Sequence, residues 1–81
     1  DGASAVLLAS KDEAERRGWR PLAKIVDFES AAVDYVNGEG LLMAPTIAVA
    51  KLLRRNHLSL QDFDYYEIHE AFAGQVLCTL R

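Results

Sequence analysis

The feature that most limits the fold of this chain is the alternation of three short apolar stretches with segments of helical character. Each stretch is rich in aliphatic, β-branched or aromatic side chains, which is typical of strands. The stretches are residues 2–9, 22–28 and 63–68. Helical patterns occur after each of them, at residues 11–17, 45–56 and 70–81. This β-α-β-α-β-α order predicts an α/β fold in which layered helices cover a mixed sheet.

The predicted helices have recognisable terminal signals. Ser10 and Glu13 have the spacing of a capping box at the start of the first helix, and Gly18 follows its end. Pro45 suits the first turn of the second helix, where its missing N–H costs nothing. Residues 59–62 have a second capping signature, which predicts a single turn before the third strand.

The composition is that of a globular chain of marginal size. Of the 81 residues, 51% are apolar and 26% are charged, and the net charge is −3. A chain of this length buries only about 60–65% of the surface that its unfolded form exposes, so it needs a well-filled core or a partner. The acidic balance argues against a nucleic-acid partner. No apolar run approaches the ~18 residues that predict a membrane span.

The single cysteine, Cys78, limits the chemistry further. It excludes an internal disulfide and a zinc site with several cysteines, and we expect no metal site. Cys78 shares a helical pattern with Val76, Leu77 and Leu80, which predicts a buried and inert thiol.

The sequence around His69 is the one place that has the character of a reactive site. His69 falls where the third predicted strand meets the last predicted helix. The positive end of a helix dipole disfavours protonation of an imidazole, so a neutral ring there could donate a hydrogen bond to a developing oxyanion. The same residues also fit a plain structural joint, with Glu70 complementing the dipole. The residues alone leave both interpretations open.

A family resemblance bears on this choice. Residues 64–75 resemble the thiolase segment that ends in Asn-Glu-Ala-Phe-Ala, and His69 stands where most members have Asn. The His-Glu-Ala-Phe-Ala form is similar to that of a subgroup that degrades long-chain fatty acids. The resemblance covers nearly the whole chain, because residues 1–8, 21–26 and 45–53 also look like thiolase motifs in the same order.

The resemblance implies a thiolase fold of two similar halves. Residues 1–10 would be the last strand of the N-terminal half, residues 11–21 a connecting helix and linker, and residues 22–81 the start of the C-terminal half. The chain begins at Asp1 without Met and stops at Arg81 directly after an apolar pattern. We therefore expect it to be a piece of a longer polypeptide.

The resemblance also implies an activity and its partners. Thiolases cleave 3-ketoacyl-CoA with CoA, or condense acyl-CoA units, through an acyl-cysteine intermediate and without a cofactor. The Cys, His and Cys of that chemistry lie outside these 81 residues, so the chain alone should be inactive. The implied partners are acyl-CoA, CoA, the remainder of the polypeptide, further copies of the subunit, and a β-oxidation partner subunit. The implied location is bacterial cytoplasm, or the mitochondrial or peroxisomal matrix.

Three residues can be assigned roles from the resemblance. His69 would stabilise the oxyanion of the thioester, directly or through a water molecule. Phe72 and Met43 would lie near the substrate. One departure from the family is Ala44, since most members have Gly there and a positive φ would be unfavourable for Ala. The alternative from another class is a small non-catalytic α/β binding or scaffold module.

Overall fold

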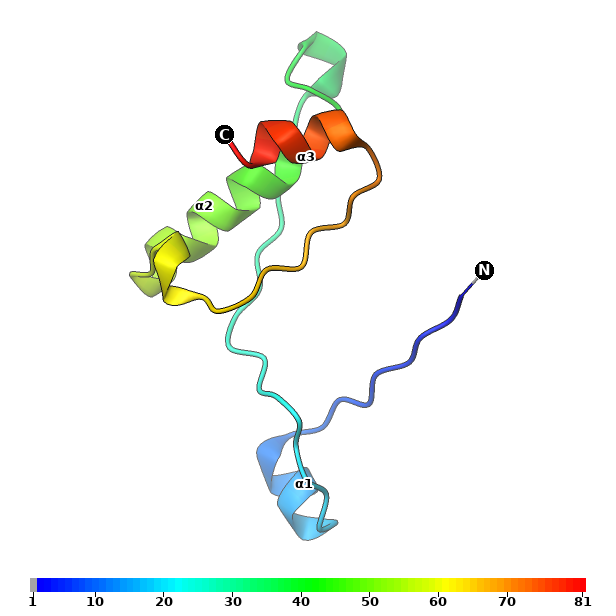
Figure 1. The fold of residues 1–81 in the computed structure, drawn as a ribbon. Helices are drawn as coiled ribbons and strands as arrows, with labels where there is room; N and C mark the ends of the chain where they lie inside the picture. The colour runs from blue at the N-terminus through cyan, green and yellow to red at the C-terminus, as the bar shows by residue number, and fades with distance from the viewer. Residues whose placement is uncertain (1) are drawn as a thin grey trace.

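The computed structural model describes residues 2–81, which contain three α-helices, two 3-10 turns and no strand. The chain is open: its radius of gyration is 16.5 Å, whereas a compact domain of this length has about 12 Å. The elements are α1 (Lys11–Arg16), η1 (Tyr35–Asn37), α2 (Ala44–Asn56), η2 (Leu60–Asp62) and α3 (Ala73–Thr79) (Figure 1). The predicted α/β fold with layered helices over a mixed sheet is therefore wrong for this chain.

The three predicted strands are extended segments that lack backbone hydrogen bonds to a neighbouring strand. Among the described residues, no backbone-to-backbone hydrogen bond involves residues 2–9, 20–33 or 63–71. The β-forming side chains give these segments an extended course, but a strand also requires a neighbour that accepts and donates along the ladder. The sequence pattern indicates an extended backbone, but it does not show whether a neighbouring strand is present.

Helix α1 follows the prediction closely. The Ser10 side chain accepts a hydrogen bond from the Glu13 N–H at 3.2 Å, as an N-cap residue should. Gly18, with φ of 65°, ends the helix, and the Trp19 N–H donates to the Ala14 carbonyl oxygen at 2.9 Å. Ala14 is 7% exposed and is the one buried apolar residue of the described chain. The core is thus confined to this small turn.

Helix α2 also forms where it was predicted, one residue earlier. Met43 is its N-cap with φ of −92°, and Ala44 is its first helical residue. Ala44 therefore does not need the positive φ that made it a suspected departure. The residues with positive φ in this connection are Gly38, with φ of 96°, and Gly40, with φ of 79°. Pro45 lies in the first turn of the helix, as predicted.

The C-terminal end of α2 is closed by a residue in the left-handed conformation. His57 has φ of 54° and ψ of 40°, and it is the one non-glycine residue with positive φ in the described chain. The Leu58 N–H donates to the Leu53 carbonyl oxygen at 3.0 Å, and the His57 N–H donates to that of Arg54 at 3.3 Å. This pair of bonds is a Schellman motif.

Polar side chains tie the same end of α2 to a distant extended segment. Arg55 donates from Nη2 to Asp27 Oδ2 at 2.8 Å and from Nη1 to Glu29 Oε2 at 2.6 Å. Asn56 donates from Nδ2 to Asp27 Oδ2 at 2.5 Å. These contacts hold residues 27–29 against the helix.

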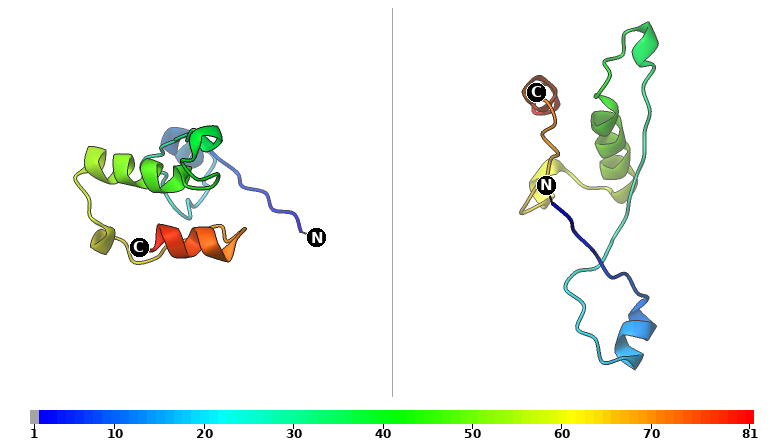
Figure 2. Two further views of the ribbon diagram at one scale, coloured as in Figure 1. Left: turned by 90° about the horizontal axis from the view of Figure 1, so that it is seen from above. Right: turned by 90° about the vertical axis from the view of Figure 1, so that its right-hand side faces the viewer.

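Helices α2 and α3 run side by side in the same direction, so that their N-terminal ends lie at the same side of the molecule (Figures 1 and 2). The extended residues 63–72 lead from turn η2 to the start of α3. Helix α3 begins at Ala73, three residues later than the predicted start at residue 70.

Candidate functional site

His69 lies on the extended connection that leads to α3, and its side chain is exposed. The N-cap of α3 is Phe72, so His69 stands three residues outside the helix. The prediction that His69 occupies the helix N-terminus is wrong, because the helix begins later than the apolar pattern suggested. A helix dipole acts within about one turn of its end, so the N-terminus of α3 is too far from His69 for this effect.

Neither His69 nor Glu70 has a hydrogen bond or ion pair with another described residue. Glu70 was predicted to complement the first turn of the last helix, but it also precedes that helix. An oxyanion hole requires two or more donors aimed at one oxygen position. The described residues supply one candidate donor, the imidazole of His69, and leave it accessible.

The segment that carries His69 is anchored just upstream. The Tyr66 hydroxyl donates to the Leu60 carbonyl oxygen, and the rings of Phe63 and Tyr66 have their centroids 5.8 Å apart at 52°. Turn η2 is closed by a capping box, in which Asp62 accepts from the backbone N–H of Ser59 at 2.7 Å. The aromatic pair at spacing i, i+3 was a sequence signal for this anchor.

Met43 and Phe72, the other predicted site residues, occupy equivalent positions at the starts of two helices. Met43 is the half-buried N-cap of α2, and its carbonyl oxygen accepts from the Thr46 hydroxyl at 2.7 Å. Phe72 is the N-cap of α3 and is 64% exposed. Both therefore lie at the side of the molecule where the two helices begin (Figure 2). Their contact with substrate stays a prediction.

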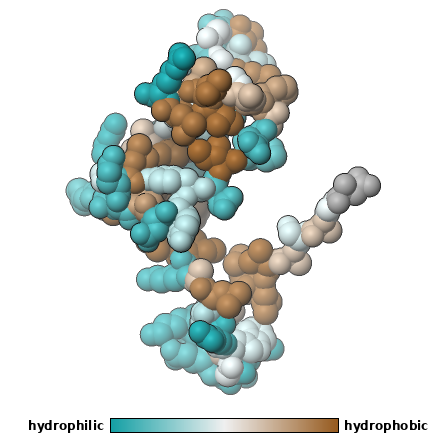
Figure 3. All heavy atoms as spheres, in the orientation of Figure 1, coloured by the Kyte–Doolittle hydropathy of each residue, from teal (hydrophilic) through white to brown (hydrophobic). Residues whose placement is uncertain are grey.

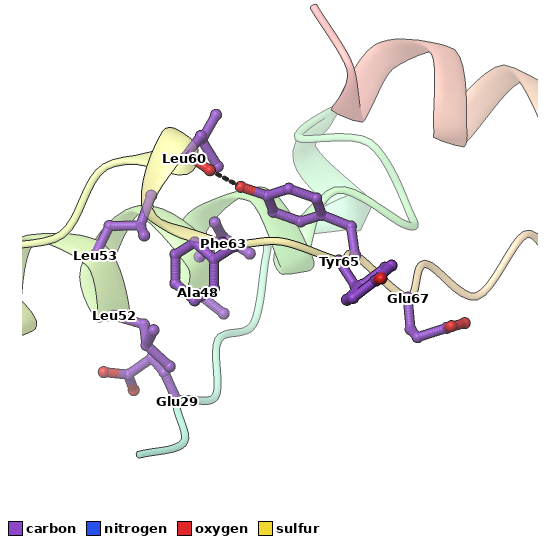
Figure 4. A pocket seen from close by; sticks show the side chains of 10 residues that line it. Glu29, Ala48, Leu52, Leu53, Leu60, Phe63, Tyr65 and Glu67 are labelled. Atoms are coloured by element: carbon purple, nitrogen blue, oxygen red, sulfur yellow. Dashed lines mark hydrogen bonds between the residues drawn. The ribbon is translucent and has the colours of Figure 1, made fainter. Parts of the chain in front are cut away.

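A groove under α2 was not anticipated from the sequence. Its volume is about 270 Å³, and it lies between the apolar side of α2 and the two extended segments beside that helix. We call it the α2 groove (Figure 4). Its lining residues are Glu29, Ala48, Val49, Leu52, Leu53, Leu60, Phe63, Tyr65, Tyr66 and Glu67.

The charges beside this groove are set largely by the contacts of Arg55 and Asn56 with residues 27–29. The pKa of Asp27 is lowered by hydrogen bonds from Asn56, then from Arg55 and from the Phe28 N–H. The pKa of Glu29 is lowered by the Ser30 N–H and then by Arg55. One wall of the α2 groove therefore carries a stabilised carboxylate whose charge is matched by a guanidinium.

Cys78 is exposed, so the prediction of a buried thiol is wrong. In the described part of the chain, no group of three or more His, Cys, Asp or Glu residues could hold a metal ion. None of the described helices has the length and apolar character that crossing a membrane requires.

Comparison with known proteins identifies the family. The family described as "Thiolase, C-terminal domain" matches residues 19–81. The chain belongs to the thiolase family. The trifunctional enzyme subunit beta of Bos taurus mitochondria is 41% identical over 81 residues, which are 100% of this chain and 17% of that protein.

Two thiolases show the same degree of similarity. The peroxisomal 3-ketoacyl-CoA thiolase of Encephalitozoon cuniculi (strain GB-M1) is 42% identical over 81 residues, 100% of this chain and 20% of that enzyme. The probable 3-ketoacyl-CoA thiolase of Caenorhabditis elegans is 44% identical over 80 residues, 99% of this chain and 17% of that protein. This thiolase chain thus spans 17–20% of the length of these relatives.

Proposed function

We propose that this chain is a segment of an acyl-CoA thiolase that cleaves 3-ketoacyl-CoA with CoA through an acyl-cysteine intermediate, or condenses acyl-CoA units in reverse. The observation that carries the proposal is the 42–44% identity, over essentially the whole chain, to proteins named 3-ketoacyl-CoA thiolase. The chain itself has one cysteine, and in our proposal the Cys, His and Cys of the reaction come from the rest of the polypeptide. The 81 residues alone are then inactive.

His69 is the residue of this chain to which we assign a catalytic role. Its imidazole donates a hydrogen bond, directly or through water, to the oxyanion that develops on the thioester oxygen. Its exposure and the anchored segment upstream support this role, since both leave the ring free to meet a substrate at a defined place. The other donors of the oxyanion hole must then come from polypeptide outside this chain.

Met43 and Phe72 complete the proposed site as apolar contacts for the substrate. Their positions at the starts of α2 and α3 support this assignment, because those two ends share one side of the molecule. We also propose that residues 1–10 belong to the N-terminal half of the thiolase, that residues 11–21 link the halves, and that residues 22–81 begin the C-terminal half.

Partners and location follow from the names of the relatives. One relative is a subunit of a trifunctional enzyme, which supports a hetero-complex with a β-oxidation partner in addition to homo-oligomers. Relatives are named mitochondrial or peroxisomal, which supports a location in the matrix of one of these organelles. Fatty-acid degradation is the role that these names favour.

The role of His69 is tested by substitution in the intact enzyme. His69→Ala should lower kcat for thiolysis of 3-ketoacyl-CoA by about 10²–10³, as the loss of one oxyanion donor does. His69→Asn should keep most of the activity, because an amide can donate the same hydrogen bond. His57→Asn is the matched control, since His57 is an exposed helix-capping histidine outside the site. An unchanged rate in His69→Ala would contradict the assignment.

A further inference from the structure

The position of His69 is not fixed by contacts of its own. Its side chain is exposed and has no hydrogen bond or ion pair with another described residue. The extended residues 63–71, which carry it, have no backbone-to-backbone hydrogen bond within the described chain. A hydrogen-bond donor must nevertheless be held in place for catalysis, since a displacement of about 1 Å can cost about 100-fold in rate. Another contact must therefore hold this segment.

One hydrogen bond ties the segment of His69 to the rest of the described chain. The Tyr66 hydroxyl donates to the Leu60 carbonyl oxygen (dashed line in Figure 4). Residues 63–71 make no other hydrogen bond to a described residue. Apolar side chains gather over the middle of the molecule (Figure 3), but apolar contacts are non-directional and allow a segment to slide. The directional bond of Tyr66 therefore sets where this segment lies.

The acceptor of this bond belongs to a well-fixed turn. Leu60 is the first residue of η2, and the capping box of that turn joins Asp62 Oδ2 to the Ser59 N–H at 2.7 Å and to the Ser59 hydroxyl at 2.9 Å. The turn follows directly on the closed end of α2, where the Leu58 N–H donates to the Leu53 carbonyl oxygen at 3.0 Å. The Tyr66 hydroxyl thus links the segment of His69 to the frame of α2.

The alternation of side chains along the extended segment relates Tyr66 to His69. Successive side chains of an extended chain point to opposite sides. Tyr66 and Ile68 are 53% and 40% exposed, whereas Tyr65 is 89% exposed. Residues 66 and 68 thus lie on the side that faces the protein, and residues 65 and 69 lie on the open side. His69 is three residues, or about 10 Å, beyond Tyr66, so a rotation of the segment at Tyr66 would carry the imidazole away from its place.

We propose that Tyr66 is a positioning residue for thiolysis: by donating to the Leu60 carbonyl oxygen, its hydroxyl holds His69 where the imidazole meets the thioester oxygen. This inference rests on the proposed function, because it assigns a support to the donor named there. Tyr66 acts through His69 and needs no contact with the substrate. Its removal should therefore lower the rate of the chemical step and leave substrate binding nearly unchanged.

Steady-state kinetics of the intact enzyme test the proposal. Tyr66→Phe removes the hydroxyl and keeps the ring, whose centroid lies 5.8 Å from that of Phe63. We expect kcat for thiolysis of a 3-ketoacyl-CoA to fall about ten-fold, as the loss of one hydrogen bond can cause, and KM to change less than about two-fold. In a His69→Ala background the same substitution should lower kcat less than about two-fold, because residues that act through one another are non-additive.

Tyr65→Phe is the matched control. It removes the same hydroxyl from a side chain that is 89% exposed and that makes no hydrogen bond in the described chain, so kcat should not change. Phe63→Leu withdraws the neighbouring ring and leaves the Tyr66 hydroxyl, and it should also lower kcat only where His69 is present. An unchanged kcat in Tyr66→Phe would overturn the proposal. An equal loss with and without His69 would overturn it too, since it would show a general loss of folded enzyme.

The NMR signal of the His69 ring, recorded on the intact enzyme with ¹³C-labelled histidine, separates this proposal from the proposed function. Tyr66→Phe should broaden or split the signal, and Tyr65→Phe should leave it single. An unchanged signal in Tyr66→Phe overturns the positioning role whether or not the enzyme is active. An enzyme that fails in thiolysis but shows the broadening refutes the proposed function and keeps the hold of Tyr66 on His69.

Discussion

At the end of α2, substitution by glycine should have opposite effects on stability at two adjacent residues, because one of them is in the left-handed conformation. His57 has φ of 54° and ψ of 40°. An L-residue in this conformation is about 1–2 kcal/mol less stable than in the right-handed region. Glycine lacks this penalty, but it adds about 0.4–1 kcal/mol of freedom to the unfolded chain. His57→Gly should therefore stabilise the end of α2 by about 0.5–1 kcal/mol.

The same substitution one residue earlier should have the opposite effect. Asn56 is the last helical residue, and its side chain donates to Asp27 Oδ2 at 2.5 Å and to the Leu52 carbonyl oxygen at 2.9 Å. Asn56→Gly removes both hydrogen bonds and places glycine in right-handed helix. We expect a loss of about 1 kcal/mol or more.

Amide hydrogen exchange at the end of α2 measures both effects. The Leu58 N–H donates to the Leu53 carbonyl oxygen at 3.0 Å, so its exchange reports the opening of the capping motif. Exchange should slow about two- to five-fold in His57→Gly and should accelerate in Asn56→Gly. Faster exchange in His57→Gly would refute the reasoning, since it would show that the side chain of His57 stabilises the cap more than its backbone strains it.

Two further predictions concern the loop before α2 and the acid response. Gly40→Ala should lower the free energy of unfolding by about 1–2 kcal/mol, because φ is +79° and a Cβ would lie 2.9 Å from Met43 Cγ. Gly2→Ala should leave it unchanged, because a Cβ at residue 2 would meet nothing within 4 Å. The pKa of Asp27 is lowered by Asn56 and Arg55, so its contribution to stability is complete above the ordinary value of about 4 and is lost as pH falls through the lowered one. Arg55→Leu should shift the carboxyl NMR titration of Asp27 to higher pH. An unshifted titration would contradict the ion pair between Arg55 and Asp27.

Local signals in the sequence predicted the parts of the fold that depend on neighbouring residues. The cap at Ser10, the turn that begins at Ser59 and the start of α2 beside Pro45 all formed as expected. Each depends on hydrogen bonds or steric limits between residues within about four positions of one another, and such local interactions can be predicted from the sequence.

The errors arose where structure depends on distant partners. Residues 22–28 and 63–68 have strong strand character but no ladder partner among the described residues. The start of α3 was placed at residue 70 because Phe72 and Val76 share a helical spacing, yet Phe72 became the N-cap. The contact of Arg55 with Asp27, 28 residues away, and the α2 groove that adjoins it had no local signal. His69 was singled out by its place between a strand pattern and a helix pattern and then by family resemblance, and its environment could not be predicted from spacing alone.

The convergence of Arg55 and Asn56 on one oxygen of Asp27 sets different limits on chain length in two regions. One residue added within α2 would rotate its last turn by about 100°, since the helix has 3.6 residues per turn, and would carry both donors away from the carboxylate. Residues added to the connection before α2 leave that geometry intact, and doubling its length costs only about 0.6 kcal/mol of closure entropy. Insertions and deletions among homologues should therefore accumulate between residues 30 and 43 and be absent between residues 44 and 56.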